Sequence, residues 1–349
     1  MALSVDKKMG LKLSKPFIRR KQLDSVLQVL IDDSDTAFQA TKDFITRVTK
    51  TLDVEAGLTF SSSFVGLLTL FQSLDLVPGD AVVTSPLSSP QFQEAALQYG
   101  LTLLFADVEA KTPLLSIQSV EDLLDQEPRL IFIDSTLGYV ADFESFKAFN
   151  IPIIEDFSYS LGGFRDSNQA GKGGDFSLYL FQTDTVLTPG GGMILLANGK
   201  KNGAILKNLQ EVVPHYHWLP ELMSALALSQ WEVREKIHEK KREIYKHLFH
   251  QIRSLSIDYP RQPGKAEALG SYYPVLIHGS VTDALNYAQK KGVPCKRAFE
   301  YVKTSLWDDD PSFCPNARNF VLKTLLFPLH PSLTNDNLSL LCKVISSLP

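Results

Sequence analysis

Two aspartates stand where a side chain could hold or move a proton. Asp134 lies at the end of the apolar run RLIFID, and Asp156 ends the run IPIIED. A carboxylate at a strand end can keep the ring nitrogen of a pyridine cofactor protonated, which makes the ring an electron sink. An aspartate at a strand end can also cap the turn or helix that follows. Asp156 taken alone therefore predicts either a cofactor partner or a local cap.

Patterns for several other ligands are absent from the sequence. GxGxxG and GxxxxGK[ST] do not occur, so dinucleotide and P-loop sites lack the glycines that they require. His247 and His250 share one face of a charged helix, where a structural role outweighs metal binding. Cys295, Cys314 and Cys342 form neither a disulfide framework nor a zinc pattern. We expect a reducing compartment and no metal site.

The two aspartates belong to an alternation of short apolar strands and helices. Strands are predicted at LTFSSS, VPGDAVVTS, LTLLFADV, RLIFIDS and IPIIED, and a buried strand pair at FSLYLF and MILLA around the turn TPGGG. Nearly continuous apolar runs are typical of a parallel sheet covered on both faces. Ligands of such sheets bind at the carboxyl ends of the strands, where Asp134 and Asp156 are expected to lie.

Helical spacing accounts for most of the remaining sequence. Two helices are predicted within 22–51, with Ser34 or Asp35 capping the second, and further helices at FVGLLTLFQSL, PQFQEAALQYG, VEDLLDQE and FESFKAF. One long helix is predicted over 221–252, followed by a strand at SYYPVLIH, a helix at VTDALNYAQKKG, a loop at PSFCPNARNF and a closing helix at NDNLSLLCKVISSL, capped by Thr334 or Asn335. The predicted domains are a large α/β domain over 1–215, with the helices of 22–51 packed on it, and a linker helix plus small α+β domain over 216–349.

Composition bounds the class of protein. The chain has 349 residues, 44% of them hydrophobic, so it can bury a sizeable core. A net charge of −4 gives no strong field for nucleic acid or an anionic membrane surface. No apolar run is long enough for a membrane helix, and no apolar leader segment precedes a small-residue cleavage site. We expect a cytoplasmic protein that binds neither nucleic acid nor membrane.

Several segments carry a family resemblance. IPIIEDFSYSLGG is followed by GDFSLYLFQTD, GGGM, ELMSALALSQWE and CPNARNFVLKTLLFPLHPSLT. In this order these segments resemble the DegT/DnrJ/EryC1/StrS family of nucleotide-sugar aminotransferases. Because SSSFVGLLTLFQSLDLVPGDAVVTS and LQYGLTLLFADV resemble the family's first units, the resemblance covers nearly the whole chain. It implies fold type I, with a mostly parallel mixed sheet between helices and a smaller C-terminal α+β domain. It also implies pyridoxal or pyridoxamine phosphate (PLP or PMP) as cofactor, a nucleotide-sugar ligand and a homodimer.

The resemblance also exposes departures at the cofactor site. Asp156 matches the family's ring-nitrogen aspartate, but Asp184 matches its Schiff-base lysine and Tyr179 its phosphate-binding serine. No lysine occurs between Gly173 and Gly199. Because an aspartate can form no imine, ordinary transamination is not expected.

Further positions of the same site have changed in character. The family's Ser-Gly-Thr phosphate turn becomes Ser62, Ser63 and Phe64, the ring that stacks on the cofactor becomes Ser89, and a glutamine becomes Tyr159. The predicted site residues are therefore Asp184 at the catalytic position and the vestigial cofactor positions Asp156, Tyr159, Ser63, Phe64, Ser89 and Tyr179. We expect Phe64, Tyr159, Tyr179 and Trp218 to fill the old pocket with apolar area.

Three functions follow from this pattern. The leading hypothesis is a catalytically degenerate binding, scaffold or regulatory protein of nucleotide-sugar or polysaccharide biosynthesis, with no tightly bound cofactor. The alternative is a PLP- or PMP-dependent aminotransferase or 3-dehydratase-like enzyme with Asp184 in place of the lysine, although a free carboxylate is a weak base at neutral pH. A third possibility is a heteromer with an active homologue, against which stands Tyr216 in place of the asparagine that reaches the partner's phosphate. An open polar cavity beside Asp156 and Asp184 would favour the altered enzyme, and a filled one the scaffold.

Overall fold

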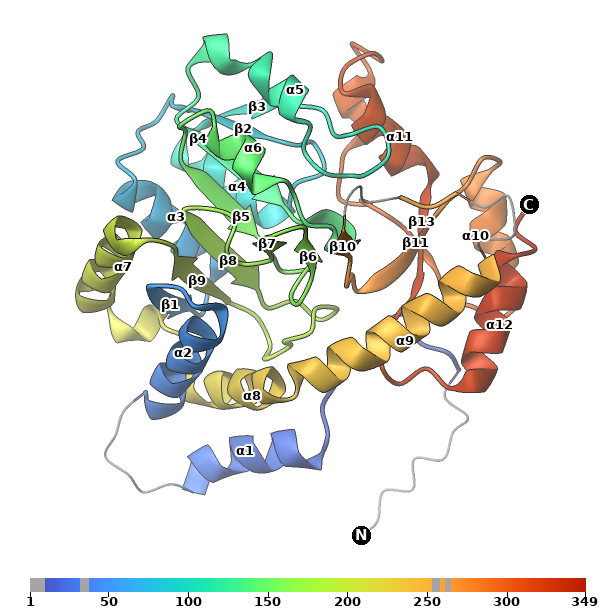
Figure 1. Cartoon of the computed structure of the whole chain (residues 1–349), viewed down its shortest axis with the longest axis horizontal. Coiled ribbons are helices and arrows are strands. Elements are labelled where there is room, and N and C mark those ends of the chain that lie inside the picture. The colour runs from blue at the N-terminus through green and yellow to red at the C-terminus, as the bar shows by residue number, and fades with distance from the viewer. Residues whose placement is uncertain (1–9, 32–37, 253–257, 261–264) are drawn as a thin grey trace.

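A seven-stranded sheet forms the centre of the larger part of the molecule (Figure 1). The computed structural model describes residues 10–31, 38–252, 258–260 and 265–349. In spatial order the strands are β1 (Ala56–Phe60), β9 (Met193–Ala197), β8 (Phe176–Leu180), β5 (Ile153–Asp156), β4 (Leu130–Asp134), β2 (Ala81–Thr84) and β3 (Thr102–Phe105). β9 runs antiparallel to both of its neighbours, while the other pairs are parallel. The predicted mixed, mostly parallel sheet is confirmed.

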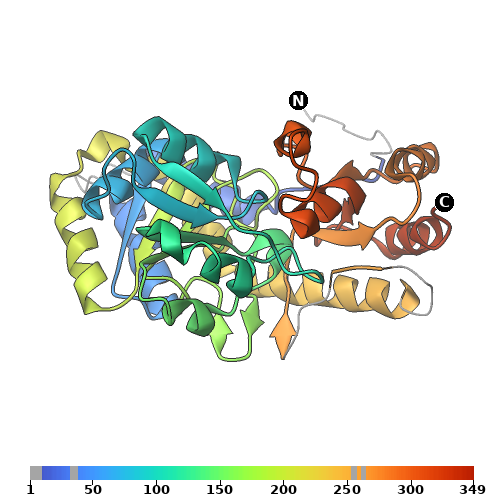
Figure 2. The same ribbon diagram turned by 90° about the horizontal axis from the view of Figure 1, so that it is seen from above.

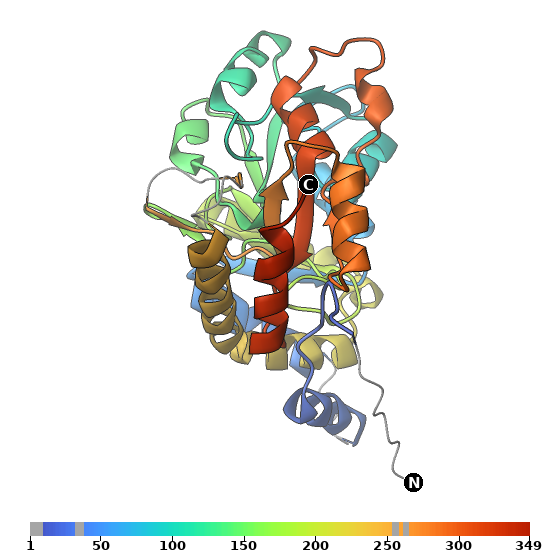
Figure 3. The same ribbon diagram turned by 90° about the vertical axis from the view of Figure 1, so that its right-hand side faces the viewer.

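Helices cover both faces of this sheet, because its strands are apolar on both sides. One face packs on α2 (Gln39–Leu52), α5 (Ile117–Glu121), α6 (Phe143–Lys147) and α8 (Glu221–Glu232) in a first core cluster. The other face packs on α3 (Ser63–Ser73), α4 (Pro90–Tyr99) and α7 (Lys200–Val212) in a second cluster. α1 (Arg20–Ile31) lies outside these layers and packs along α8 (Figure 3).

A three-stranded antiparallel sheet organises the smaller part, which Figure 2 shows beside the larger one. Its strands in spatial order are β11 (Tyr272–Leu276), β13 (Thr324–Pro328) and β12 (Lys296–Arg297). A third core cluster joins one face to α9 (Arg234–Ile252), α10 (Val281–Lys290) and α12 (Asn335–Ile345), and a fourth joins the other face to α11 (Pro315–Lys323). α8 and α9 link the two parts along one side of the molecule (Figure 1).

Short elements complete the architecture. A small antiparallel sheet contains β10 (Ala266–Glu267), β6 (Phe164–Arg165) and β7 (Asn168–Gln169). Single 3₁₀ turns span Leu124–Gln126, Thr136–Gly138, His215–His217 and Thr304–Trp307. No helix in the described part of the chain is long and apolar enough to cross a membrane.

The structure differs from the sequence prediction in three places. The helix expected over 221–252 is two helices, because Val233, with φ −104° and ψ 4°, leaves the helical region between α8 and α9. The loop expected over 311–320 contains the start of α11, with Pro315 in the first turn, where a missing N–H costs nothing. The helix expected at 120–127 is shorter, since α5 ends at Glu121 and a 3₁₀ turn follows.

Two predicted caps have different outcomes. Thr334 caps α12 as predicted, and Asn337 completes a capping box with it. Ser34 and Asp35 lie outside the described residues, so the cap predicted for α2 cannot be compared with the structure.

The N-terminal segment 10–19, here called the arm, touches both parts of the molecule. Leu11 packs on the third core cluster and Leu13 on the fourth, both in the smaller part. Phe17 packs on the first cluster, beneath the large sheet. The His330 Nε2 atom lies 3.0 Å from the Lys12 carbonyl oxygen, which fixes the arm between these contacts.

Candidate functional site

A cavity of about 370 Å³ opens between the carboxyl ends of the large sheet and one end of the small sheet. The large part contributes the ends of β4 and β5, the start of α4 and the loop after β8; the small part contributes β11, β12 and the turn after β12. The polar and charged residues of its lining are Ser89, Gln91, Asp134, Ser135, Thr136, Asp156, Tyr159, Gln182, Thr183, Asp184, Ser271, Tyr272, Lys296, Arg297, Glu300 and Tyr301. Polar and charged residues thus outnumber apolar ones in the lining, although most of the exposed lining surface comes from apolar atoms.

Asp134 and Asp156 form a carboxyl pair at one end of this cavity. They are register partners at the ends of the parallel strands β4 and β5, which brings their side chains to the same edge. Asp156 Oδ1 accepts hydrogen bonds from the Ser158 backbone N–H, at 2.9 Å, and from the Ser158 hydroxyl. The Ser89 backbone N–H donates to Asp134 Oδ1 at 3.3 Å. A strand-end aspartate here does hold the following turn, as the simpler interpretation of Asp156 predicts.

Burial changes the acidity of this pair. It raises the pKa of Asp156 to about 6, against the opposing hydrogen bonds of Ser158 and Ser89. It raises the pKa of Asp134 well above its usual value, and the neighbouring charge of Asp156 adds to that effect. Two adjacent buried carboxyls cannot both ionise cheaply, so the pair retains a proton into the range near neutral pH.

Asp184 lies on another wall, among donors from both parts of the molecule. The Tyr272 hydroxyl donates to Asp184 Oδ2 at 2.7 Å, and the Tyr159 hydroxyl lies 3.2 Å from Asp184 Oδ1 and 2.8 Å from Gln182 Oε1. Lys296 Nζ is 3.6 Å from Asp184 Oδ2 and 4.5 Å from the centre of the Tyr272 ring. Burial, followed by the charge of Asp184, raises the pKa of both phenols. Both tyrosines are therefore neutral donors at physiological pH.

A second lysine approaches Asp184 from behind this wall. Lys241 on α9 is buried and donates to the Leu269 carbonyl at 3.0 Å. With Asp184 it lines a separate cavity of about 30 Å³. Burial lowers the pKa of Lys241 to about 7, and the charge of Asp184 opposes that shift. Asp184 thus interacts with a cation on each side.

Four of the predicted site residues come together at the cavity. Asp156, Asp184, Ser89 and Tyr159 all line it. The expectation that the pocket is filled is wrong, because the cavity remains open although the Tyr159 ring forms part of its wall. The hydroxyl of Tyr159 is drawn toward Gln182 and Asp184, which leaves the space beside Asp156 clear.

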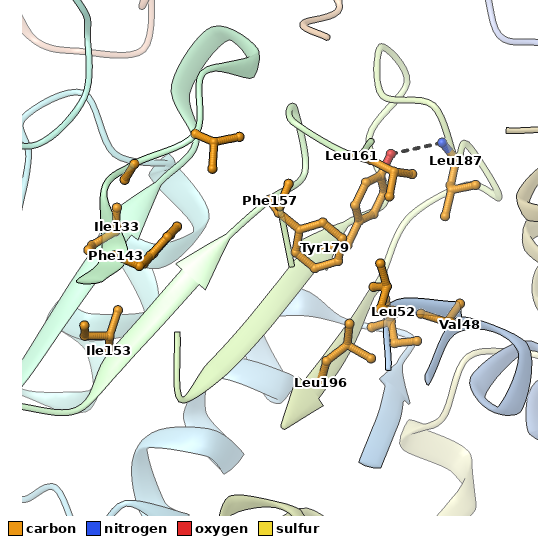
Figure 4. Close-up of a cluster of buried hydrophobic side chains, with 14 of the residues drawn as sticks. Val48, Leu52, Ile133, Phe143, Ile153, Phe157, Leu161, Tyr179, Leu187 and Leu196 are labelled. Atoms are coloured by element: carbon orange, nitrogen blue, oxygen red, sulfur yellow. Dashed lines mark hydrogen bonds between the residues drawn. The ribbon is translucent and has the colours of Figure 1, made fainter. Parts of the chain in front are cut away.

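The other three predicted positions lie elsewhere. Tyr179 is fully buried in the first core cluster, where its hydroxyl accepts the backbone N–H groups of Val186 and Leu187 at 3.0 and 3.1 Å. Figure 4 shows the bond to Leu187. Ser63 and Phe64 are in the first turn of α3 and are not part of the cavity lining. Phe64 packs against the second core cluster, which also contains Trp218. These rings stabilise the core and do not occupy the site.

The phosphate turn of the resemblance is not available to a ligand in this cavity. The Ser62 hydroxyl accepts the Val65 backbone N–H at 3.4 Å and so caps α3 itself. None of Ser62, Ser63 and Phe64 lines the cavity. The ring-nitrogen partner Asp156 is in place, but a phosphate group would find no cradle at this turn. The residues present therefore do not fit pyridoxal phosphate as a whole.

The small part contributes site residues that the sequence patterns do not reveal. Lys296, Arg297 and Tyr272 reach the cavity from β12 and β11. β12 has only two residues, both charged, so no apolar period could reveal it. The closeness of Lys296 to Asp184 depends on the packing of two sheets, which a local pattern does not encode. Among the described residues no cluster of metal-binding side chains occurs.

The comparisons with known proteins agree with one another. The model of the DegT/DnrJ/EryC1/StrS aminotransferase family matches residues 16–346. A GDP-perosamine synthase of Escherichia coli is 22% identical over 314 residues, covering 84% of this chain and 85% of that protein. The dTDP-4-amino-4,6-dideoxy-D-glucose transaminase of Shigella dysenteriae is 22% identical over 322 residues, covering 85% and 87%.

Solved structures share the fold over almost the whole chain. A putative sugar aminotransferase from Streptococcus pneumoniae in its PMP form superposes with a TM-score of 0.88 at 17% identity, and the match covers 97% of each chain. The aminotransferase PseC of Helicobacter pylori superposes with a TM-score of 0.85 at 20% identity, covering 97% of this chain and 98% of the other. The fold type I architecture predicted from the sequence is therefore confirmed.

Proposed function

The chain belongs to the DegT/DnrJ/EryC1/StrS aminotransferase family, and from that premise we propose that it binds a nucleotide-linked sugar and moves a proton on it, with Asp184 in the place of the family's lysine. The observation that carries the proposal is the open cavity beside Asp156 and Asp184, which both carboxyl-bearing residues line together with Lys296. The printed names of two relatives, a GDP-perosamine synthase and a dTDP-sugar transaminase, support a nucleotide sugar as the ligand.

Proton transfer is the chemistry open to the Asp184 wall. The carboxylate is the proton acceptor for a carbon next to a sugar carbonyl. The electron pair left by that proton moves to the carbonyl oxygen, which the Lys296 ammonium stabilises. Loss of the hydroxyl on the next carbon, which leaves as water with the proton taken up by Asp184, would give an unsaturated keto sugar.

The proposed proton transfer does not use pyridoxal phosphate. We propose that it does not bind tightly, because the Ser62–Phe64 turn is committed to α3 and the core. Its binding would supply an electron sink next to Asp156. The solved PMP and PLP forms belong to similar proteins and not to this one.

Two measurements test the function. Calorimetric titration with a nucleotide-linked 4-keto-6-deoxy sugar is expected to show saturable binding. The same sugar incubated with the protein in D₂O is expected to gain deuterium at the carbon next to the carbonyl, detected by mass spectrometry. Asp184→Asn should retain binding and lose the exchange, whereas Asp53→Asn, a carboxyl on the surface, should behave as the wild type.

The outcomes separate the enzyme from the binding protein. Binding without deuterium exchange would contradict the proposed proton transfer. It would favour the catalytically degenerate binding or scaffold protein instead. Absence of binding by every nucleotide-linked keto sugar tried would overturn both.

A second candidate function follows from Lys296. It is the one lysine among the residues that line the cavity, and it lies beside Asp184, the position that matches the family's lysine. A family aminotransferase with its amine supplied from β12 is therefore the competing proposal. Borohydride reduction of the protein mixed with pyridoxal phosphate, followed by peptide mapping, tests it: a stable adduct on Lys296 would support this candidate, and its absence would rule it out.

We further propose that the chain acts as a cytoplasmic homodimer. Support comes from α1, on which Leu23, Leu27 and Leu30 are more than half exposed at helical spacing. A domain boundary near Tyr216 is also proposed; α8, which follows it, packs in the first core cluster, and α9 leads from there into the third. Sedimentation equilibrium tests the dimer.

A further inference from the structure

A second, smaller cavity lies directly behind the Asp184 wall of the candidate site. It measures about 30 Å³ and is here called the small cavity. Thr183, Asp184 and Ser271 line both cavities, so at Asp184 a single residue separates the two spaces. The Lys241 side chain lines the small cavity together with Asp184. A proton that Asp184 takes up on the side of the candidate site is therefore subject to the charge of Lys241 on the other side.

The amine of Lys241 is buried with fewer partners than an ammonium group requires. The residue is 3% exposed, and among the described residues its Nζ atom has one hydrogen bond, to the Leu269 carbonyl at 3.0 Å. An ammonium group has three N–H donors. His330 lines the same cavity, is 7% exposed and has no partner for its Nδ1 atom among the described residues. A polar space of this size has room for a water molecule that bonds to such groups.

Asp184 supplies the negative charge next to Lys241. Among the described residues that line the small cavity, it is the only carboxylate. Burial lowers the pKa of Lys241 to about 7, and the charge of Asp184 opposes that shift. Burial also lowers the pKa of both nearby histidines, which are therefore neutral at physiological pH. The other titratable groups around Lys241 thus add no negative charge: they are Lys15 of the arm, His330 after β13, and His238 and Arg242 on α9.

We propose that Lys241 is a positioning residue of the proton transfer, which acts through Asp184 and sets the strength of that carboxylate as a base. The inference rests on the proposed function, since it concerns the same proton acceptor. The ammonium form of Lys241 stabilises the carboxylate and makes it a weaker base, whereas beside the neutral amine Asp184 is a stronger base. No bond to Lys241 forms, and the proton that leaves the sugar is on Asp184 in either case.

The proposal predicts that deuterium exchange into the bound sugar becomes faster as the pH rises. Lys241 loses its proton as the pH passes about 7. Asp184 is then the stronger base, and the exchange rate should rise about 3-fold between about pH 6 and about pH 8. On the side of the candidate site Asp184 faces Lys296 and the phenols of Tyr159 and Tyr272, which burial keeps neutral over this range.

Other carboxyl groups titrate over the same range. Burial raises the pKa of Glu155 to about 7 and that of Asp156 to about 6. The profile of the wild type alone therefore does not identify Lys241, and variants that fix its charge are required.

Two substitutions fix the charge of Lys241 in opposite states. Lys241→Met is neutral at every pH, so it should lose the rise and exchange at the rate that the wild type reaches at high pH. Lys241→Arg remains charged, so it should lose the rise and keep the low-pH rate. Lys240→Met is the matched control, because this neighbouring lysine is half-exposed and pairs with Glu243; it should keep the wild-type profile. Exchange is measured by mass spectrometry in D₂O with a saturating nucleotide-linked 4-keto-6-deoxy sugar.

A second measurement follows the charge of Lys241 itself and does not require a Lys241 variant to fold. In protein with ¹³C-labelled lysines, NMR titration should show one lysine with a midpoint near pH 7. Asp184→Asn removes the charge that favours the ammonium form, so it should move that midpoint to lower pH. Asp53→Asn, on the surface, should leave the midpoint unchanged.

The possible results are distinct from those of the functional test. A rise in exchange with pH that persists in Lys241→Met would overturn the role of Lys241 and leave the proposed function standing. A lysine midpoint that does not move in Asp184→Asn would also overturn it. Absence of exchange in the wild type at every pH would instead remove the proposed function, and this inference with it.

Discussion

At the scale of single residues, Asp184 is surrounded by hydrogen-bond donors and lysines from both parts of the molecule. It accepts from Tyr272, lies beside Tyr159 and faces Lys296, while the buried Lys241 stands behind it. A lysine at this position would lie beside Lys296. The surroundings therefore favour a carboxylate here, as the proposed exchange of the family's lysine for Asp184 requires.

Removal of Asp184 should destabilise the protein more than removal of Lys296. Asp184→Ala leaves the Tyr272 phenol and Lys296 without their acceptor, while Tyr159 keeps Gln182 and Lys241 keeps the Leu269 carbonyl. A loss of about 1–3 kcal/mol in the free energy of unfolding is expected. Lys296→Met should cost under about 1 kcal/mol, because the lysine side chain is 36% exposed. Urea denaturation measures both. Equal losses would contradict the central role given to Asp184.

Substitution of Tyr179 should affect stability, whereas substitution of Tyr159 should affect ligand binding. Tyr179→Phe removes the acceptor of two backbone N–H groups in the core, and a loss of about 1–3 kcal/mol is expected. The variant should bind the ligand as the wild type does, because Tyr179 does not line the cavity. Tyr159→Phe should instead bind the ligand more weakly while its free energy of unfolding changes little, because Tyr159 lines the cavity. Paired denaturation and titration measurements check this, and weakened binding in Tyr179→Phe would count against the placement of the site.

At the scale of elements, the strand β5 carries two carboxyl groups with different structural roles. Asp156 points into the cavity lining, while Glu155 is fully buried on the other side and accepts the N–H groups of Gly171 and Gly173, both at 2.8 Å. The Ser177 hydroxyl also donates to it at 3.2 Å. Glu155 thereby holds the turn that leads into β8, and with it the strand that precedes Asp184.

Glu155 predicts a pH dependence of stability. Burial raises its pKa from the usual value of 4.5 to about 7. Because the folded form holds the proton more tightly, the contribution of Glu155 is fully present below about pH 4.5 and is lost as the pH rises through 7. Glu155→Gln should flatten the decline in unfolding free energy between pH 5 and 7, measured by urea denaturation at several pH values. A slope identical to that of the wild type would show that another group is responsible.

The elements of the large sheet could be predicted because each strand is an apolar run bounded by a turn. RLIFID and IPIIED became β4 and β5, and their final aspartates lie together as expected. The small sheet was only partly predictable, since β12 is two charged residues and β13 follows directly on α11. The cavity could not be predicted, because whether Tyr159 and Tyr179 fill it depends on their partners in space. The Tyr179 hydroxyl is bonded to the loop after β8, so its ring does not fill the cavity.

At the scale of the whole molecule, the cavity has walls from both sheets, so its shape depends on how the two parts are held. α8 and α9 join them on one side (Figure 1). The arm joins them through Leu11, Leu13 and Phe17. Two connections of this kind favour unfolding of the parts as one cooperative unit.

Loss of the arm contacts should uncouple the parts. The combined change Leu11→Ala, Leu13→Ala and Phe17→Ala removes partly buried apolar groups, and should replace a single calorimetric transition by two. The exposed pair Lys12→Ala and Lys15→Ala serves as the control. A single, unshifted transition in the triple variant would mean that the arm is dispensable for coupling.

The arm also has a consequence for how the protein is made. Residues 10–17 leave the ribosome early, yet Leu11 packs on the third core cluster, which includes Leu341 and Ile345, and the Lys12 carbonyl lies beside His330. The large sheet, complete by Ala197, can form during synthesis, because domains generally fold as units from the N-terminal side. The arm can settle only after β13 and α12 have been translated. The cavity, whose lining extends to Leu326, therefore takes its final shape later than the large sheet.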